Sequence, residues 1–489
     1  MILRRTWNKK TLVTLATPGT RQTIASCRMC MVPRLMSTPI LIRMPTRAPM
    51  PTEPKARRPV RAVRPEDLER GTPLYCVWEI TLACDLGCRH CGSRAGKARP
   101  DELSTKECLE VVDQLAKLGI REVTLIGGEA YLREDWPQIA AEITRQGMVC
   151  SMTTGGRDLS AKRVEQAVES GIRIISVSLD GLQQTHDALR GRKGAFESAL
   201  ASARRIADSP IRLGVNTQIN RLSLPELPAL VDVLVELGIN AWQLQLTVPM
   251  GRAADRPELL LQPYDLLEVF PLLAYLKATK LSPRGIGLYP GNNIGYFGPY
   301  EQMLRFRGEE GVHWSGCSAG KWSIGLEADG KIKGCPSLPT QHYTGANVRD
   351  LSIAETVATT PELKYLRERT VEDLWGYCRT CYYAAECKAG CSWTSHSLLG
   401  KTGNNPYCIH RAMDFERRGQ RERVVKVEGA SGKPFDTGRF EIVVEAMEER
   451  APLELRTILG RSQEEVASLS GDAPSIWSLE HIRQALKRS

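Results

Sequence analysis

The feature that most constrains the fold of this chain is an alternation of apolar, strand-like runs with amphipathic helical runs between residues 74 and 281. The expected strands are 74–81, 123–126, 149–154, 174–179, 211–218 and 242–247. Six such units in series imply a parallel sheet with right-handed crossovers. Periodicity leaves open whether the sheet is flat or curls into a partial barrel. In both cases functional groups gather at the carboxyl ends of the strands.

The helices between these strands carry their own end signals. Ser104 and Glu107 form a capping box before an apolar helical face that ends at Gly119. Asp135 is expected to cap a second helix, which Gly147 ends. Further helices are expected over 160–171, 195–207, 224–237 and 263–281.

Three cysteines follow the first strand at C-x3-C-x2-C spacing: Cys84, Cys88 and Cys91. This spacing lets three thiolates reach three corners of one small cluster, and soft thiolates select zinc or iron–sulfur. A structural zinc site uses four protein ligands, and the next cysteine, Cys108, falls in a predicted helix. Three ligands on a [4Fe-4S] cubane leave one iron free for a small molecule. The spacing resembles the signature of the radical S-adenosylmethionine (SAM) superfamily, in which that iron binds the amino and carboxylate groups of SAM.

Two glycine motifs end the second and third strands. Gly127-Gly128-Glu129 ends the second, where glycines let a ligand approach the backbone and a carboxylate accepts charge-assisted hydrogen bonds. The resemblance assigns this motif to the SAM amino group. Thr153-Thr154-Gly155-Gly156 ends the third strand, and Thr154 replaces the Asn of the family's T-N-G, so its role is open.

The fourth strand runs into Ser178-Leu-Asp-Gly-Leu-Gln-Gln-Thr-His-Asp-Ala-Leu-Arg190. This run is similar to the S-L-D-G-x4-H-D-x2-R pattern of the peptide- and protein-modifying branch. By that resemblance Ser178 and Arg190 bind the SAM carboxylate, and Asp180 lies nearby. His186 and Asp187 are expected to cap the start of a helix.

Seven more cysteines follow residue 312: Cys317, Cys335, Cys378, Cys381, Cys387, Cys391 and Cys408. Their C-x2-C-x5-C-x3-C core resembles the SPASM extension of radical SAM enzymes, and Gly330 lies five residues before Cys335 as in that pattern. Two zinc sites are the alternative, since C-x2-C is also typical of zinc.

The SPASM resemblance implies two auxiliary iron–sulfur clusters. It assigns Cys317, Cys335 and Cys391 to the first cluster and Cys378, Cys381, Cys387 and Cys408 to the second. The first cluster then lacks a fourth cysteine, and another residue, a water or the substrate completes it. Cys76 and Cys150 lie in predicted strands and are expected to be small core residues.

Together these patterns predict an α/β fold, a partial (β/α)6 TIM-like barrel followed by a small, loop-rich, cysteine-rich iron–sulfur domain. The expected segments are a basic Pro-rich leader (1–70), the radical SAM core (71–283), a bridge (284–312), the SPASM domain (313–412) and a C-terminal extension (413–489). In the extension we expect a strand at 440–446 and a helix at 479–487, with no assigned role.

Charge and cysteine usage bound the location and partners. Residues 1–75 carry 15 Lys and Arg against 4 Asp and Glu, whereas the remainder carries 51 against 52, so the body gives no support for nucleic-acid binding. The leader is expected to be disordered or an over-extended gene start, with a transit peptide as the alternative. The sequence contains no run of 18 apolar residues, so no membrane span is predicted. Cysteines clustered at metal spacings favour the reducing cytoplasm.

The resemblance implies an enzyme whose reduced cluster cleaves SAM to methionine and a 5′-deoxyadenosyl radical, which removes hydrogen from a substrate. The auxiliary clusters then accept an electron. Expected partners are a peptide or protein substrate and an electron donor such as flavodoxin or ferredoxin. The first interpretation is oxidative modification of a ribosomally made peptide, because the core resembles the enzymes that act on the pyrroloquinoline quinone and mycofactocin precursors.

Three other functions remain open. Related proteins modify tetrapyrrole side chains. Sulfatase maturation is disfavoured, because Pro336 stands where those enzymes carry an Asp after the cysteine corresponding to Cys335. An iron–sulfur electron carrier or redox sensor without catalysis would not need Glu129, Ser178 and Arg190.

Overall fold

The computed structural model describes residues 60–295, 297–305, 314 and 316–447. The chain divides into two compact units, Met1–Arg57 and Arg58–Ser489, and the described residues belong to the second. The leader before residue 60 and the helix expected at 479–487 therefore lie outside the described residues.

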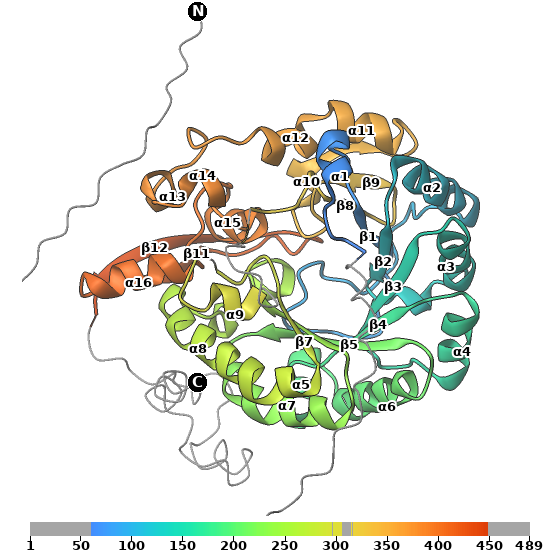
Figure 1. Ribbon diagram of the computed structural model, residues 1–489, viewed down its shortest axis with the longest axis horizontal. Helices are drawn as coiled ribbons and strands as arrows, with labels where there is room; N and C mark the ends of the chain where they lie inside the picture. The colour runs from blue at the N-terminus through green and yellow to red at the C-terminus, as the bar shows by residue number, and fades with distance from the viewer. Residues whose placement is uncertain (1–59, 296, 306–313, 315, 448–489) are drawn as a thin grey trace, which may run out of the picture. The chain divides into compact units, whose positions relative to one another are not determined.

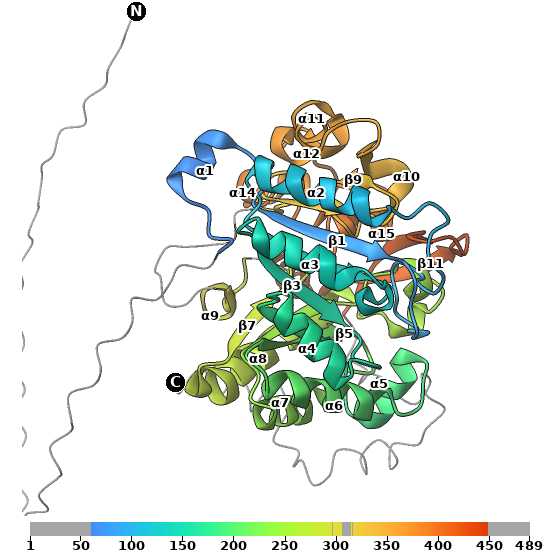
Figure 2. The same ribbon diagram turned by 90° about the vertical axis from the view of Figure 1, so that its right-hand side faces the viewer.

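A ten-stranded sheet forms the centre of the second unit, in the order β10-β9-β8-β1-β2-β3-β4-β5-β6-β7 (Figure 1). Its first six strands are β1 (Tyr75–Thr81), β2 (Glu122–Gly127), β3 (Val149–Thr154), β4 (Ile174–Ser178), β5 (Arg212–Ile219) and β6 (Ala241–Leu246). They pair in parallel, with Leu125 of β2 opposite Trp78 of β1 and Met152 of β3. The sheet curls with its helices outside, so the predicted α/β partial barrel is confirmed (Figures 1 and 2).

The helices that connect these strands are α2 (Thr105–Leu118), α3 (Trp136–Arg145), α4 (Ala161–Glu169), α5 (Gln183–Arg190), α6 (Ala195–Ala207) and α7 (Leu227–Glu236). The capping box is confirmed, because the Ser104 side chain accepts the N–H of Glu107 while the Glu107 carboxylate accepts the N–H of Ser104. Asp135 precedes α3 as predicted but does not cap it. Its carboxylate instead accepts hydrogen bonds from Arg133 and Thr105, each at 2.6 Å.

The next helix, α8 (Leu266–Leu276), continues into a π-helical turn at Lys277–Leu281. By length and composition alone, Pro257–Arg284 could cross a membrane, but 78% of its most apolar window is buried inside the protein. An apolar helix buried in this way is typical of a protein core.

The sheet continues beyond the predicted six strands at both edges. β7 (Gly287–Pro290) pairs in parallel with β6, inside the segment predicted as a bridge. At the other edge β8 (Ser323–Leu326) pairs in parallel with β1, followed by the antiparallel strands β9 (Lys331–Lys333) and β10 (Thr344–Asn347). The cysteine-rich segment thus joins the barrel sheet and is not separate from it. Strands of three or four residues are too short to show a period-two pattern.

Short helices make up most of the remaining chain: α9 (Glu301–Arg305), α10 (Thr340–Tyr343), α11 (Ile353–Thr359), α12 (Pro361–Glu368), α13 (Tyr377–Thr380), α14 (Ala384–Cys387), α15 (Ser392–Leu399) and α16 (Ile409–Arg417). A hairpin of β11 (Gln420–Glu428) and β12 (Arg439–Ala446) follows. The strand expected at 440–446 is confirmed, whereas β11 was not predicted.

The last part of the predicted leader is structured. α1 (Pro65–Arg70) lies there, and Asp67 forms a 2.6 Å ion pair with Arg121. Arg61 lies over the Tyr75 ring of β1, 3.5 Å from its centroid. The expected disorder is therefore wrong for residues 60–70.

The core lies between the sheet and its helices. Cys76 and Cys150 are fully buried in β1 and β3, which confirms them as core residues.

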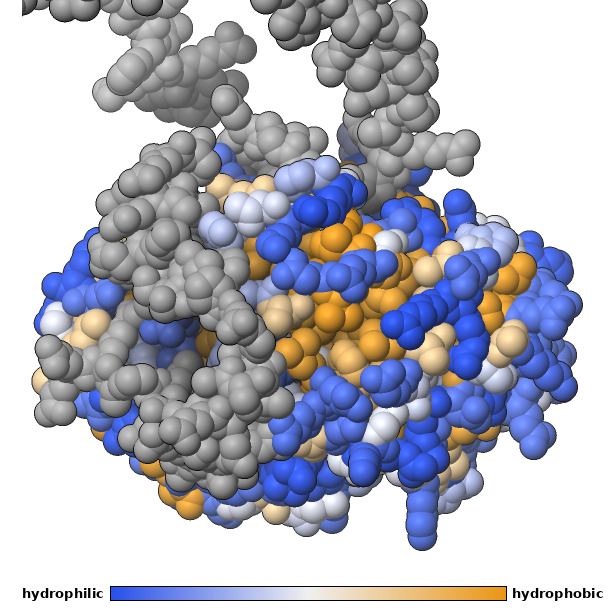
Figure 3. All heavy atoms as spheres, turned by 90° about the horizontal axis from the view of Figure 1, so that it is seen from below, coloured by the Kyte–Doolittle hydropathy of each residue, from blue (hydrophilic) through white to orange (hydrophobic). Residues whose placement is uncertain are grey.

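Figure 3 views the unit from below Figure 1, the side on which α7 lies, and shows a hydrophobic patch bordered by hydrophilic side chains. Val233 and Val235 of α7 are only partly buried.

Candidate active site

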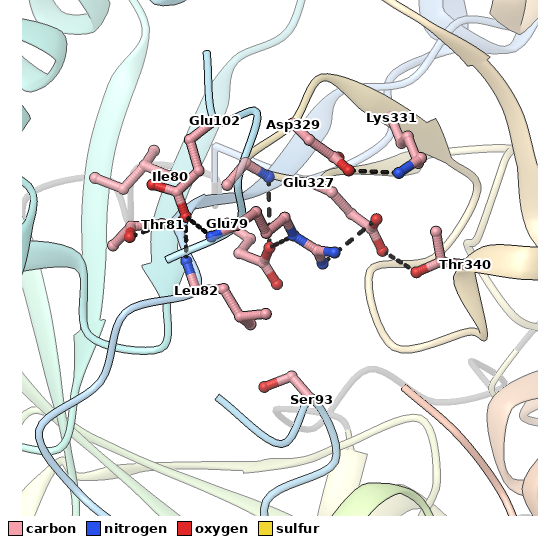
Figure 4. A network of polar contacts seen from close by, with 12 residues as sticks. Glu79, Ile80, Thr81, Leu82, Ser93, Glu102, Glu327, Asp329, Lys331 and Thr340 are labelled. Atoms are coloured by element: carbon pink, nitrogen blue, oxygen red, sulfur yellow. Dashed lines mark hydrogen bonds and ion pairs between the residues drawn. The ribbon is translucent and has the colours of Figure 1, made fainter. Parts of the chain in front are cut away.

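The cysteine loop leaves the carboxyl end of β1 and is closed by one carboxylate. Glu102 Oε1 accepts the N–H of Leu82 at 2.8 Å and the N–H of Arg99 at 2.9 Å, and the Thr81 hydroxyl lies 3.1 Å away (Figure 4). Residues before and after Cys84–Cys91 are therefore held by the same oxygen. The sequence analysis did not identify Glu102.

The glycines of the Gly-Gly-Glu motif fasten β2 to this loop. A Cβ on Gly127 would lie 2.4 Å from the Thr81 carbonyl oxygen, and one on Gly128 would lie 2.2 Å from that of Ala83. The N–H of Glu129 donates to the Ala83 oxygen at 2.7 Å. These glycines permit the approach of the chain's own backbone, in addition to any ligand.

Glu129 is 1% exposed and has one free oxygen. Its Oε2 accepts the N–H of Gly155 at 2.7 Å, so the motif that ends β3 contacts the motif that ends β2. Its Oε1 has no hydrogen-bond partner among the described residues. Burial raises the pKa of Glu129 to about 8, although the Gly155 N–H opposes this shift.

Asp180, which follows β4, is buried between Arg190 and His90. Its Oδ2 lies 2.6 Å from Arg190 Nη2 and 3.1 Å from His90 Nε2. Burial alone would raise the pKa of Asp180, but Arg190 and His90 outweigh it and hold that pKa well below its usual range. Arg190 also donates to Cys88 Sγ at 3.7 Å, which joins the α5 motif to the cysteine loop.

His186 and Asp187 have different roles. Asp187 lies inside α5, so the predicted helix-start cap is wrong, but its carboxylate accepts the N–H groups of Gly194 and Phe196 at the start of α6 at 2.7 and 2.8 Å. His186 is not a cap, because its Nδ1 accepts the Asp180 N–H at 3.1 Å. Burial, followed by the charge of Arg190, lowers the pKa of His186 to about 3, which leaves a neutral ring with its proton on Nε2.

Buried polar atoms without a hydrogen-bond partner in the described part of the chain gather here. They are Asp85 Oδ1, His90 Nδ1, Glu129 Oε1, His186 Nε2, Arg190 Nε and Asn216 Oδ1. Ser178 ends β4 opposite Asn216 of β5, at the same edge. Each unmade hydrogen bond costs about 1–3 kcal/mol. A ligand with amino and carboxylate groups supplies partners of both kinds, so these residues fit SAM beside a cluster on Cys84, Cys88 and Cys91.

A turn after β6, which the sequence analysis missed, holds the loop from another side. Arg252 Nε donates to the Cys88 oxygen at 2.7 Å, and its N–H donates to the Cys91 oxygen at 2.9 Å. A Cβ on Gly251, whose φ is +57°, would lie 2.3 Å from the Gly92 oxygen. A Gly-Arg pair shortly after a strand end was the available signal.

The C-terminal hairpin, to which the sequence assigned no role, also contacts the loop. Arg94 Nε donates to Asp436 Oδ1 at 2.7 Å, and the N–H of Gly251 donates to the Asp436 backbone oxygen at 2.8 Å. Met250 and Thr437 form an antiparallel bridge. The segment between β11 and β12 therefore supports the cysteine loop.

Four of the later cysteines line one cavity. Cys378, Cys381, Cys387 and Cys408 surround an empty volume of about 370 Å³ that includes open solvent. This is the set that the SPASM resemblance assigns to the second auxiliary cluster. Among the described residues, no three His, Cys, Asp or Glu groups converge on a single metal ion. In a cubane each thiolate binds a different iron, so such convergence is not required.

The other three cysteines are Cys391, which is buried, and Cys317 and Cys335, which are partly buried. Burial, followed by the charge of Cys317, raises the pKa of Cys391 to about 12 and that of Cys335 to about 11. Burial and the charges of Cys317 and Cys335 also raise the pKa of Tyr365 well above its usual value. The Tyr365 hydroxyl is buried without a geometrically well-formed hydrogen bond in the described structure. Tyr365 is thus a neutral phenol beside Cys317 and Cys335, a neighbour that sequence spacing did not reveal.

Hydrogen bonds to sulfur separate two predicted ligands from one core cysteine. Cys88 Sγ accepts one from Arg190 at 3.7 Å, and Cys378 Sγ accepts one from the N–H of Asn405 at 3.4 Å. In contrast, Cys108 donates to the Leu103 oxygen at 3.9 Å. Hydrogen bonds of this kind stabilise thiolates and tune clusters.

The fold is a partial barrel with a three-cysteine loop after β1 and buried charged groups at the ends of the following strands. These features define a class of α/β enzymes whose site lies at the carboxyl edge of the sheet. Residues 78–239 match the family model of the radical SAM superfamily. The chain therefore contains a radical SAM domain, and seven further cysteines follow it between residues 317 and 408.

Two relatives match this chain over nearly the whole of their own length. An AdoMet-dependent heme synthase of Methanosarcina barkeri is 29% identical over 355 residues, 70% of this chain and 97% of the relative. The mycofactocin maturase MftC of Mycobacterium ulcerans is 27% identical over 375 residues, 73% of this chain and 95% of the relative. Streptococcus suis SuiB bound to its precursor peptide SuiA has a similar fold, with a TM-score of 0.54 at 16% identity over 70% of this chain and 76% of SuiB.

We expect Glu129→Gln to weaken SAM binding about tenfold, because a hydrogen bond to a charged group contributes about 1.5–3 kcal/mol. Below its pKa of about 8 the Glu129 carboxyl is protonated and accepts poorly. Wild-type affinity should therefore rise between pH 6.5 and 8.5 more steeply than that of the variant. Equilibrium dialysis with SAM at both pH values measures this, with Glu142→Gln on α3 as the control. Equal affinities and equal pH slopes would exclude Glu129 from the SAM site.

Proposed function

We propose that this radical SAM enzyme oxidises its substrate through a radical that SAM supplies at the Cys84–Cys88–Cys91 cluster. The observation that carries the proposal is the meeting of this loop with Glu129, Asp180 and Arg190 at one edge of the sheet. A bound SAM-cluster pair supplies the 5′-deoxyadenosyl radical. Glu129 accepts a hydrogen bond from the SAM amino group, and Arg190, oriented by Asp180, pairs with its carboxylate together with Ser178.

The two later cysteine sets favour net oxidation. After a substrate loses a hydrogen atom, a second electron must leave before a stable product forms. The cavity lined by Cys378, Cys381, Cys387 and Cys408 supports a second auxiliary cluster, and the proximity of Cys317, Cys335 and Cys391 supports a first. We assign both sets to the acceptance and onward transfer of that electron.

The substrate we propose is a ribosomally made peptide. The mycofactocin maturase relative and the fold of SuiB with its precursor peptide support it. A hollow of about 840 Å³, open to solvent, lies beside the loop and is lined in part by Arg94, Lys97 and Pro434. We place the entry of the peptide at this hollow.

A tetrapyrrole is the second candidate substrate, because the heme synthase relative matches over 97% of its own length. For either substrate we propose a cytoplasmic enzyme that receives electrons from a flavodoxin or ferredoxin. The neutral charge of residues 76–489 gives no reason to propose nucleic acid as a partner.

The test is incubation of anaerobically reconstituted enzyme with SAM, dithionite and either peptides encoded near the gene or an iron porphyrin with propionates. We expect mass spectrometry to show a peptide that has lost two hydrogens, or a carboxyl group with its electrons. The Cys378→Ala/Cys381→Ala variant should cleave SAM but leave the peptide unchanged. If the porphyrin is converted and the peptide is unchanged, the proposed peptide substrate is contradicted. The proposed radical mechanism would still stand.

A further inference from the structure

A buried network of two carboxylates and two cations lies between the cysteine loop and the turn that carries Cys335. Arg99 Nε donates to Glu79 Oε1 of β1 at 2.8 Å, and Arg99 Nη2 lies 3.4 Å from Glu327 Oε2 (Figure 4). Lys333 Nζ lies 2.6 Å from Glu327 Oε1. The residues Glu79, Glu327 and Lys333 are 3%, 1% and 0% exposed, so solvent screens these charges little.

One end of the network holds the cysteine loop. Glu79 precedes the loop on β1, and Arg99 follows it, so their ion pair spans the loop. The Arg99 N–H also donates to Glu102, the carboxylate that binds Thr81 and Leu82 (Figure 4). Displacement of Arg99 would therefore release one side of the loop.

The other end holds Cys335. Lys333 Nζ donates to the carbonyl oxygens of Leu338 at 2.7 Å and Pro336 at 3.1 Å. These two oxygens flank the turn just after Cys335, and Thr340 donates its hydroxyl proton to Glu327 (Figure 4). A single ammonium therefore fixes the position of this turn.

The C-terminal hairpin covers the network. The ring of Phe435 lies 4.3 Å from Lys333 Nζ and 5.6 Å from the Arg99 guanidinium carbon, measured to the ring centroid. Phe435 is 8% exposed and has a φ of +57°, a conformation that a bulky residue holds only when its surroundings fix it. The cation–π contacts and the exclusion of water strengthen the charges beneath.

We propose that Lys333 and Glu327 are positioning residues that fix the first auxiliary cluster relative to the SAM-binding cluster and set its reduction potential with opposite signs. This inference rests on the proposed auxiliary cluster at Cys317, Cys335 and Cys391. Reduction adds negative charge to a cluster, so a buried cation nearby favours the reduced state and a buried carboxylate disfavours it.

The experiment is a redox titration of reconstituted protein, followed by electron paramagnetic resonance, on Lys333→Met, Glu327→Gln and the double variant. We expect Lys333→Met to lower the potential of one auxiliary cluster and Glu327→Gln to raise it, with the double variant between them. Product formation should fall about tenfold in Lys333→Met, whereas SAM cleavage without substrate should stay within about twofold.

Lys331→Met is the matched control, because Lys331 lies on the same strand, is 37% exposed in its side chain and pairs with Asp329. It should leave the potential unchanged. If Lys333→Met does not fold, Thr340→Val removes only one hydroxyl from Glu327 and should shift the same potential. The proposal would be overturned if the reduction potential shifted in the same direction in the Lys333 and Glu327 variants. It would also be overturned if the potential did not shift in any of these variants that fold.

Cys335→Ala separates this inference from the function on which it rests. One outcome is that Cys335→Ala loses about four irons while the Lys333 and Glu327 variants show no opposite shifts in reduction potential. That result would overturn only the positioning role. If Cys335→Ala kept all its iron, the auxiliary cluster itself would be contradicted.

Discussion

Replacement of Cys84, Cys88 and Cys91 by Ala will abolish the reductive cleavage of SAM. The loop is the cysteine set that meets Glu129 and Arg190 at the carboxyl edge of the sheet. Without its thiolates no iron is held where SAM can bind beside these groups. Chromatography of 5′-deoxyadenosine, formed with dithionite and SAM, measures the loss.

The triple variant should also lose about four irons and keep the others. Cys108→Ala is the matched control, because Cys108 lies in α2 and donates to a carbonyl oxygen. We expect it to keep the full iron content and the wild-type rate. Formation of 5′-deoxyadenosine by the triple variant at the wild-type rate would refute the assignment of this loop.

Gly128→Ala is expected to lower SAM cleavage by about a hundredfold, because a misplacement of about 1 Å costs that much. The added Cβ would lie 2.2 Å from the Ala83 oxygen and 2.6 Å from the Leu82 oxygen. Both are backbone atoms, so the cysteine loop must shift away from β2. The overpacking should also cost about 1–3 kcal/mol of unfolding free energy.

Gly96→Ala is the control for this substitution, since a Cβ there meets nothing within 4 Å. It lies in the same loop region and should change neither the rate nor the stability by much. The rates of 5′-deoxyadenosine formation and the midpoints of thermal unfolding for both variants give the comparison. Equal rates in the two glycine variants would show that β2 does not position the loop.

The six parallel strands were predictable because each is apolar and followed by a helix with its own end signals. The cysteine loop after β1 was predictable from its short spacing, whereas the division of the later seven cysteines into two sets rests on the SPASM resemblance and stays a prediction. β7 and β8 were not, since a strand of four residues carries too little pattern. Their place depends on pairing with β6 and β1, which lie far away in the sequence.

The supporting residues of the site were also beyond local pattern. Arg252 meets the cysteine loop about 160 residues away in the chain, and Asp436 meets Arg94 across 342 residues. Lys333 resembles any surface lysine until folding buries it completely. Charged side chains are almost never fully buried unless paired, so sequence reasoning places them outside by default.

Iron and sulfide content, with Mössbauer spectra of the reconstituted chain, tests the central claim most directly. That claim assigns ten cysteines to three separate clusters. We predict about twelve irons per wild-type chain and about eight in the Cys84, Cys88 and Cys91 variant. A two-iron auxiliary cluster would lower both numbers by about two. Zinc at Cys378, Cys381, Cys387 and Cys408, with iron confined to the first loop, would contradict the account.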